Sequence, residues 1–205
     1  MHPSKKHTHN VPRPGCYVPA VTFFDSDTDR LDLDAQAKYY SYLASTGLTG
    51  LVILETNGET FLLSREERTA LLELARKSVP TNYPIIAGVS GHSTSQVIEF
   101  IADACPAGAD YALVLPCAYF GKQTTPAVKQ VALAESPTKT GIAITKYAAV
   151  TFTAPKAGIP NAASLLKPRH PYEAPLEAAK ESIWTAMEGL DKEEQRILAP
   201  TQTRP

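Results

Sequence analysis

The sequence predicts an α/β protein built on a parallel sheet. From Tyr17 onward, short apolar runs alternate with longer stretches whose apolar residues recur at helical spacing, a pattern typical of repeated strand–helix units. The apolar runs show little alternation of polar and apolar residues, as expected for strands that are covered on both faces. With 205 residues and 43% hydrophobic content, the chain can bury one substantial core, so a single globular unit is expected.

The first strand–helix unit is predicted at residues 17–24 (YVPAVTFF) and 33–46. The helix is expected to bury one face and to end at Gly47. That face comprises Leu33, Ala37, Tyr40 and Ala44.

The second unit contains the best-marked helix. A strand is expected at residues 51–54 and a helix at 64–79, where Ser64 and Glu67 have the spacing of a capping box and Pro80 follows. Within it, Glu73 and Lys77 are spaced to pair at i,i+4. Its apolar face is predicted to comprise Leu71, Leu72 and Ala75.

Two further units complete the repeat. Strands are predicted at 84–89 and 111–115, and helices at 93–105 and 125–134. After Ser136-Pro137 the pattern breaks. Residues 141–153 fit a strand or a helix, and 160–175 hold four prolines, which predicts an extended connection. A last helix is expected at 174–189, with Leu176, Ala179, Ile183 and Met187 on one side and Trp184 nearby.

Composition excludes some classes of partner. Twenty basic and 21 acidic residues give a net charge of -1, so neither nucleic acid nor an anionic membrane is an expected partner, whereas a small molecule or another protein is. Cys16, Cys105 and Cys117 have neither disulfide-like nor zinc-like spacing, and we expect reduced, mostly buried thiols. No apolar run has the length of a membrane span or the layout of a secretory signal.

Residues 1–14 are predicted to form a disordered tail. Lys5, Lys6 and Arg13 precede the first acidic residue, as in a mitochondrial transit peptide, but three prolines in the tail oppose the helix that such a peptide needs. A cytoplasmic location is therefore expected, with a mitochondrial one as the alternative. His2, His7 and His9 are expected to be incidental, and neither a metal site nor a cofactor is predicted.

Two polar segments follow predicted strands, where the loops of a parallel fold converge on one opening: residues 54–59 (LETNGE) and 115–120 (LPCAYF). Together with 84–91 (PIIAGVSG) and 64–68 (SREER), they resemble the dihydrodipicolinate synthase and N-acetylneuraminate lyase family of pyruvate-dependent class I aldolases. The resemblance runs from residue 15 to 137 and resumes at 145–148 and 165–180.

That resemblance implies an incomplete (β/α)8 TIM barrel. Residues 15–137 would supply about four βα units as the N-terminal half of the barrel, and 138–205 a residual C-terminal helical segment. A complete barrel of this kind needs roughly 250 residues, so the later strands cannot be supplied within this length. Four units leave two open sheet edges. We therefore expect a homo-oligomer or hetero-oligomer formed through these edges, an edge covered by residues 142–152 as an added strand, or poor stability.

The resemblance assigns substrate binding to Thr56 and Asn57, which would hold the carboxylate of a 2-oxo acid such as pyruvate, and gives Thr56 a catalytic role as well. Two small polar residues beside a glycine at a strand end also form an anion-accepting nest on physical grounds. An ordinary turn is the alternative. Glu55 departs from the family, which usually has glycine there, and its carboxylate would repel an anionic substrate.

Tyr119 and Phe120 match a tyrosine pair of the family, one member of which relays protons across a subunit interface. A hydroxyl both donates and accepts a hydrogen bond, so Tyr119 is the candidate catalytic relay, with an interface aromatic as the alternative. Phe120 cannot take that role because it has no hydroxyl.

The family's imine-forming lysine lies in a G-x-K segment of the sixth strand, and a Y-N-x-P motif lies on the fifth; neither motif occurs in this sequence. Class I aldol chemistry needs such a desolvated lysine. The nearest substitutes are Lys139, Lys146 and Lys156. Lys146 matches a lysine of a peripheral helix, and we expect all three to be solvated.

Three functional hypotheses follow. The first is a lyase of this family that acts on a 2-oxo acid but is impaired or inactive for lack of the lysine. The second is a non-catalytic homologue that associates with a full-length paralogue or another protein. The third is a coding sequence joined incorrectly around residues 136–141, which comparison of the transcript with genomic DNA tests.

Overall fold

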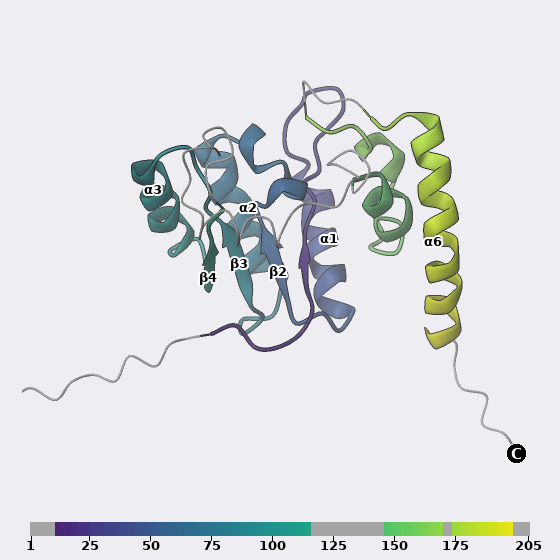
Figure 1. Ribbon diagram of the computed structural model, residues 1–205, viewed down its shortest axis with the longest axis horizontal. Coiled ribbons are helices and arrows are strands. Elements are labelled where there is room, and N and C mark those ends of the chain that lie inside the picture. The colour runs from purple at the N-terminus through teal and green to yellow at the C-terminus, as the bar shows by residue number, and fades with distance from the viewer. Residues whose placement is uncertain (1–10, 116–145, 170–173, 199–205) are drawn as a thin grey trace, which may run out of the picture.

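A computed structural model of the chain describes residues 11–115, 146–169 and 174–198. Its sheet has four strands, β1 (Tyr17–Pro19), β2 (Gly50–Ile53), β3 (Ile85–Gly88) and β4 (Tyr111–Leu113), each parallel to the next and paired in chain order (Figure 1). The parallel sheet is as predicted. Every residue of β2 is buried, whereas β4 is partly exposed, because β2 has a strand on each side and β4 lies at the end of the pairing order.

Three helices follow the first three strands: α1 (Leu33–Ser45), α2 (Arg65–Ser78) and α3 (Thr94–Ala104). Side-chain oxygens of Asp32, Ser64 and Ser93 accept hydrogen bonds from the amides of their first turns and so begin the helices. The predicted capping box of α2 is present, and so are its buried apolar residues and the Glu73–Lys77 pair. α1 packs against α2, and α2 against α3.

The buried face of α1 differs from the prediction. Its buried residues are Ala35, Gln36, Tyr39, Tyr40 and Leu43, whereas Leu33 is 43% exposed. The helix is rotated because Gln36 enters the core, where its side chain accepts a hydrogen bond from the Phe23 amide at 2.8 Å and donates one to the Val21 carbonyl at 3.0 Å. These two bonds satisfy backbone groups after β1 that pair with no strand of the described sheet. They also explain why β1 ends at Pro19 rather than at residue 24.

Residues 146–153 are helical. The added strand that was considered at 142–152 is therefore wrong for residues 146–152, and residues 142–145 lie outside the described residues. Residues 146–148 are α-helical, a π-helical turn follows at Ala149–Thr153 and a 3-10 turn at Ala162–Leu165. Lys146, Val150 and Ala154 are buried at a spacing of four, which fits a helix and not a strand. Val150, Ala154, Ile159 and Leu165 join the core formed by the strands and α1.

The last helix, α6 (Glu177–Leu198), is nine residues longer at its end than predicted. It continues through Gly189, which costs about 1 kcal/mol in a helix, and the Lys192–Glu188 ion pair at 2.6 Å spans that position. α6 lies on the α1 side of the molecule, away from α3 (Figure 1). Its Trp184 ring packs edge-on against Phe152 with centroids 4.8 Å apart.

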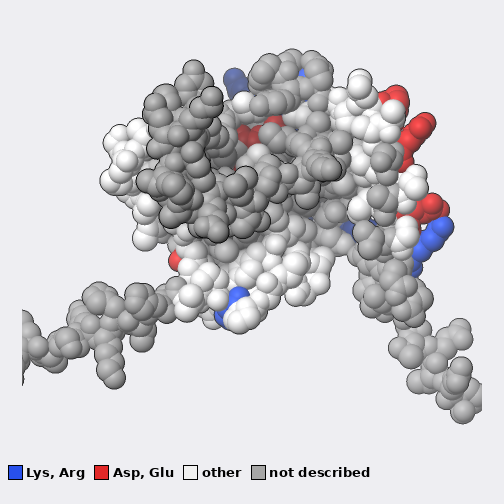
Figure 2. Space-filling model, in the orientation of Figure 1, with Lys and Arg blue, Asp and Glu red and all other residues white. Residues whose placement is uncertain are grey.

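Charged side chains of both signs lie together along α6 (Figure 2), where Lys180 pairs with Glu177. No helix in the described parts of the chain combines the length and the apolarity that crossing a membrane requires. Cys16 and Cys105 are exposed, contrary to the prediction of buried thiols, because both lie at the ends of elements; Cys117 lies outside the described residues.

Candidate functional site

The candidate site lies at the carboxyl ends of the strands, where the predicted segment 54–59 forms two short turns. Residues Thr56–Gly58 make one 3-10 turn and Thr60–Leu62 a second. The first turn is tied to the chain after β1, because the Thr22 hydroxyl donates a hydrogen bond to the Gly58 carbonyl at 2.6 Å. The sheet thus positions this turn from two adjacent strands.

The end of β2 is held close to the end of β3. A Cβ added at Gly88 would lie 2.1 Å from the Leu54 carbonyl oxygen, so only glycine fits there. Leu54 itself has a φ of 67°, a left-handed conformation that a non-glycine residue adopts at a cost. A strained residue therefore lies two positions before the predicted binding turn.

Thr56 and Asn57 are both half-buried in this turn. The Thr56 amide donates a hydrogen bond to the Glu55 carboxylate at 3.3 Å. The amides of Gly58, Glu59 and Thr60 donate to carbonyls of the same loop. An internal carboxylate thus already contacts one amide of the predicted nest, at the position where the sequence departs from the family pattern.

Glu59 follows the turn in a left-handed conformation, with φ of 56°, and is 1% exposed. One carboxylate oxygen accepts a hydrogen bond from Lys146 Nζ at 2.8 Å, and the other from the Arg169 amide at 2.8 Å. Lys146 has no exposed surface, so the expectation that it is solvated was wrong. Burial lowers the pKa of Lys146, and the charge of Glu59 and its hydrogen bond oppose that shift.

Arg169 joins three neighbouring loops. Its guanidinium forms two hydrogen bonds of 2.6 Å with the Glu67 carboxylate, and it also donates to the carbonyls of Leu62 at 3.0 Å and Asp29 at 2.8 Å. The hydrogen bonds from Arg169 lower the pKa of Glu67. Lys146 Nζ and the Arg169 guanidinium lie 4.6 and 4.7 Å from the centroid of the Phe24 ring, close enough for cation–π attraction.

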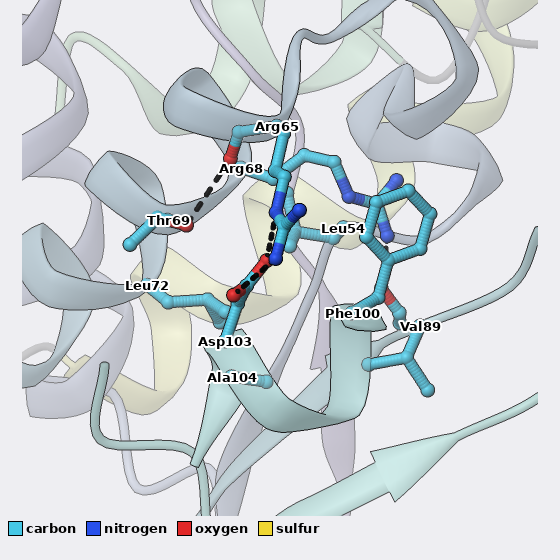
Figure 3. Close-up of a pocket in the computed structure, with 10 residues that line it drawn as sticks. Leu54, Arg65, Arg68, Thr69, Leu72, Val89, Phe100, Asp103 and Ala104 are labelled. Carbon is cyan, nitrogen blue, oxygen red and sulfur yellow. Dashed lines mark hydrogen bonds and ion pairs between the residues drawn. The ribbon is translucent and has the colours of Figure 1, made fainter. Parts of the chain in front are cut away.

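Arg68 holds the same loop from α2, and Figure 3 shows its side chain beside the Phe100 ring. It donates hydrogen bonds to the carbonyl and hydroxyl oxygens of Thr60 and, at 2.9 Å, to the Gly88 carbonyl, and its guanidinium stacks 4.0 Å from the Phe100 ring centroid. Burial lowers the pKa of Arg68 to about 10. Beside it, Arg65 pairs with Asp103 across a cavity of about 10 Å³, which has room for roughly one water molecule. This cavity is a packing feature.

Of the predicted site residues, Thr56 and Asn57 lie in the turn at the carboxyl end of β2, whereas Tyr119 lies outside the described residues, as do Phe120 and Lys139. Lys156 is exposed. Sequence reasoning missed the roles of Glu59, Arg68 and Arg169. Glu59 could have been noticed as the last residue of the LETNGE segment, whereas nothing in the local sequence marks Arg169.

Comparisons with known proteins identify the family and the fold. The model of the dihydrodipicolinate synthetase family matches residues 13–138. A protein of Coccidioides immitis, named provisionally as a mitochondrial 4-hydroxy-2-oxoglutarate aldolase, is 36% identical over 299 aligned positions that include 86% of this chain and 95% of the relative. Since 86% of 205 residues fill only about 176 of those 299 positions, roughly 120 positions of the alignment have no counterpart in this chain.

Solved structures agree. A dihydrodipicolinate synthase family protein from Coccidioides immitis superposes with a TM-score of 0.77 at 36% identity, covering 90% of this chain and 97% of that one. A prophage protein of the same family from E. coli K12, solved with pyruvate, matches with a TM-score of 0.50 at 30% identity, covering 58% of this chain and 41% of that one.

Other curated relatives, which are aldolases, synthases or lyases by name, are matched over only 31% to 38% of their length. The four paired strands with their helices are thus part of a (β/α)8 barrel. The chain belongs to the dihydrodipicolinate synthetase family of lyases, as a member with an incomplete barrel.

Proposed function

We propose that this chain binds pyruvate or another 2-oxo acid at the Thr56–Gly58 turn and does not break carbon–carbon bonds through an imine. One observation carries the second half of this proposal. Lys146 is the only fully buried lysine in the described parts of the chain, and its Nζ donates to Glu59 at 2.8 Å. The remaining described lysines are at least partly exposed.

Imine formation needs a neutral amine that a carbonyl carbon can reach. The Lys146 side chain has no exposed surface and its Nζ is hydrogen-bonded to a buried carboxylate, so a substrate carbonyl has no path to it. Burial lowers the pKa of Lys146, which favours a neutral amine, but the enclosure remains. Loss of the family's catalytic lysine with the later strands is the simplest account of these features.

Binding of a 2-oxo acid is supported by the position of Thr56 and Asn57. Both residues lie half-buried at the carboxyl end of a parallel sheet, where ligands of such folds bind. A structurally similar family member was solved with pyruvate. The Glu55 carboxylate beside the Thr56 amide must move when an anionic ligand binds, so weak affinity is expected.

Borohydride trapping tests the proposal. The purified chain is incubated with pyruvate and sodium borohydride and analysed by intact mass spectrometry, with an active family enzyme as the positive control. We expect no adduct on this chain, together with pyruvate binding in ligand-observed NMR that weakens when Thr56 is replaced by Val. A reduced adduct that disappears when one lysine is replaced, accompanied by turnover, would overturn the assignment.

Association with another protein is a second candidate function. β4 is the last strand in the pairing order of the described sheet. Val114 (51%), which directly follows it, and Ile98 (60%) and Ile101 (41%) of α3 are large exposed apolar side chains. Light scattering after size exclusion gives the molar mass of the associated species. Val114→Lys should lower this mass if the chain associates with itself through β4. A monodisperse monomer that recovers no partner in co-purification counts against this role.

The place of action is proposed to be the mitochondrion or the cytoplasm. The name of the Coccidioides relative includes a mitochondrial location, which favours the first. Fractionation of cells that express the tagged chain distinguishes the two.

A further inference from the structure

We propose that Lys146 and Arg169 are positioning residues that hold the Thr56–Gly58 turn in its ligand-receiving shape through Glu59. On this view, the C-terminal segment 146–169 is part of the binding site although its side chains do not touch the ligand. This inference rests on the proposed binding of a 2-oxo acid and adds the residues that fix the shape of that site.

Glu59 is the junction between the two turns of the loop. Its amide donates to the Thr56 carbonyl at 3.0 Å and closes the first turn, and its left-handed backbone starts the second. A buried non-glycine residue keeps such a conformation only where its surroundings over-determine it. The conformation of Thr56–Gly58 therefore depends on what holds Glu59.

In the described parts of the chain, both donors to the Glu59 carboxylate come from the C-terminal segment. Lys146 Nζ reaches one oxygen and the Arg169 amide the other, each at 2.8 Å, across 87 and 110 residues of chain. Without them the carboxylate would be buried and unpaired, a state that charged groups leave by turning toward water. Movement of Glu59 would release the closure of the first turn.

Arg169 fixes the far side of the same loop. Its contacts with the Leu62 carbonyl and the Glu67 carboxylate hold the end of the second turn against the start of α2. The Phe24 ring lies near both cations and keeps them on the β1 side of the loop. Both turns are thus bounded by the C-terminal segment.

A catalytic role for Lys146 fits less well than positioning. Its Nζ donates a hydrogen bond to Glu59, and its side chain has no exposed surface.

Hydrogen–deuterium exchange of the full chain tests the inference without any ligand. Lys146→Met keeps an unbranched side chain that is one atom shorter and removes its charge, and Lys77→Met at an exposed position is the matched control. We expect amides 55–60 to exchange at least tenfold faster in Lys146→Met, while peptides from α3 stay unchanged. Unchanged exchange at 55–60, or an equal increase throughout the chain, would overturn the proposal.

Rescue by a second variant separates positioning from general stability. Glu59→Gln with Lys146→Met leaves a neutral side chain whose carbonyl can still accept from the Arg169 amide. We expect this double variant to regain most of the protection at 55–60, even if Lys146→Met alone folds poorly. Protection that stays as low as in Lys146→Met would contradict the role assigned to the pair.

Pyruvate titration by NMR then links the loop to the ligand. If the unmodified chain binds pyruvate, Lys146→Met should raise its Kd at least tenfold and Lys77→Met should not; equal affinities would overturn the positioning role. If the unmodified chain does not bind pyruvate, the proposed function fails, and the exchange experiment still decides whether the C-terminal segment orders the loop.

Discussion

Arg169 and Glu67 form a two-pronged ion pair across 102 residues of sequence, with both hydrogen bonds at 2.6 Å. Glu67 also accepts a hydrogen bond from the Ser64 amide at 2.9 Å as part of the capping box of α2. The same carboxylate therefore begins a helix and anchors the C-terminal segment. Because Glu67 has both roles, we expect its loss and the loss of Arg169 to lower the free energy of unfolding by different amounts.

Arg169→Gln should destabilise the chain by about 2–3 kcal/mol, because it removes a charge-assisted pair that is mostly buried. Glu67→Ala should cost about 1 kcal/mol more, since the capping box is lost as well. Urea denaturation followed by circular dichroism measures both, with exposed Lys77→Gln as the control. Equal costs for the two variants would contradict the double role of Glu67.

The same pair predicts a dependence of stability on pH. Hydrogen bonds from Arg169 hold the pKa of Glu67 below its ordinary value of 4.5. A carboxyl group with a lowered folded pKa adds stability above its unfolded pKa, and this is lost as pH falls through the folded value. The urea midpoint should therefore fall more steeply below pH 4.5 in the unmodified chain than in Arg169→Gln. Parallel profiles would argue against the pairing.

Glu55→Gly should strengthen pyruvate binding roughly tenfold, because it removes a carboxylate that contacts the Thr56 amide and repels an anion. Glu55→Gln keeps the size of the side chain and removes only its charge. Its affinity for pyruvate should therefore lie between those of the unmodified chain and Glu55→Gly. Isothermal titration at low salt provides the Kd values. Unchanged affinity in both variants would show that Glu55 does not compete with the ligand.

Gly88→Ala and Gly189→Ala should have opposite effects. A Cβ at Gly88 would lie 2.1 Å from the Leu54 carbonyl oxygen, so the ends of β2 and β3 must separate, at a cost of at least about 3 kcal/mol. At Gly189 nothing lies within 4 Å and the residue is within α6, so alanine should stabilise the helix by up to about 1 kcal/mol. Thermal melts of the two variants provide the comparison.

The sequence predicted what local patterns determine. The helix α2 was predicted to within a residue at each end, because Ser64, Glu67 and Pro80 mark its limits chemically. The four strands lie where their apolar runs predicted them, although β1 is shorter because Gln36 takes over the backbone groups that follow it.

The candidate site was predictable only in part. Thr56 and Asn57 could be proposed from the sequence because they belong to a contiguous motif at a strand end, and their binding role stays a prediction. Lys146 could not be assigned, since its burial depends on a carboxylate 87 residues away that nothing in its own neighbourhood marks. The helical state of residues 146–153 could not be predicted for the same reason. It depends on the burial of Lys146 and Val150, and burial is not encoded in the residues next to them in sequence.

Pairing of each strand with the next one along the chain has a consequence for biosynthesis. The sheet can assemble as soon as the first 115 residues leave the ribosome, because each new strand finds its neighbour already in place. The anchor formed by Lys146 and Arg169 arrives last, and until then Glu59 remains an acidic side chain on an unfinished surface. A nascent chain stalled when residue 115 has left the ribosome and residue 146 has not should therefore carry a formed sheet and a protease-sensitive loop at 55–62, and release of the remaining residues should protect that loop.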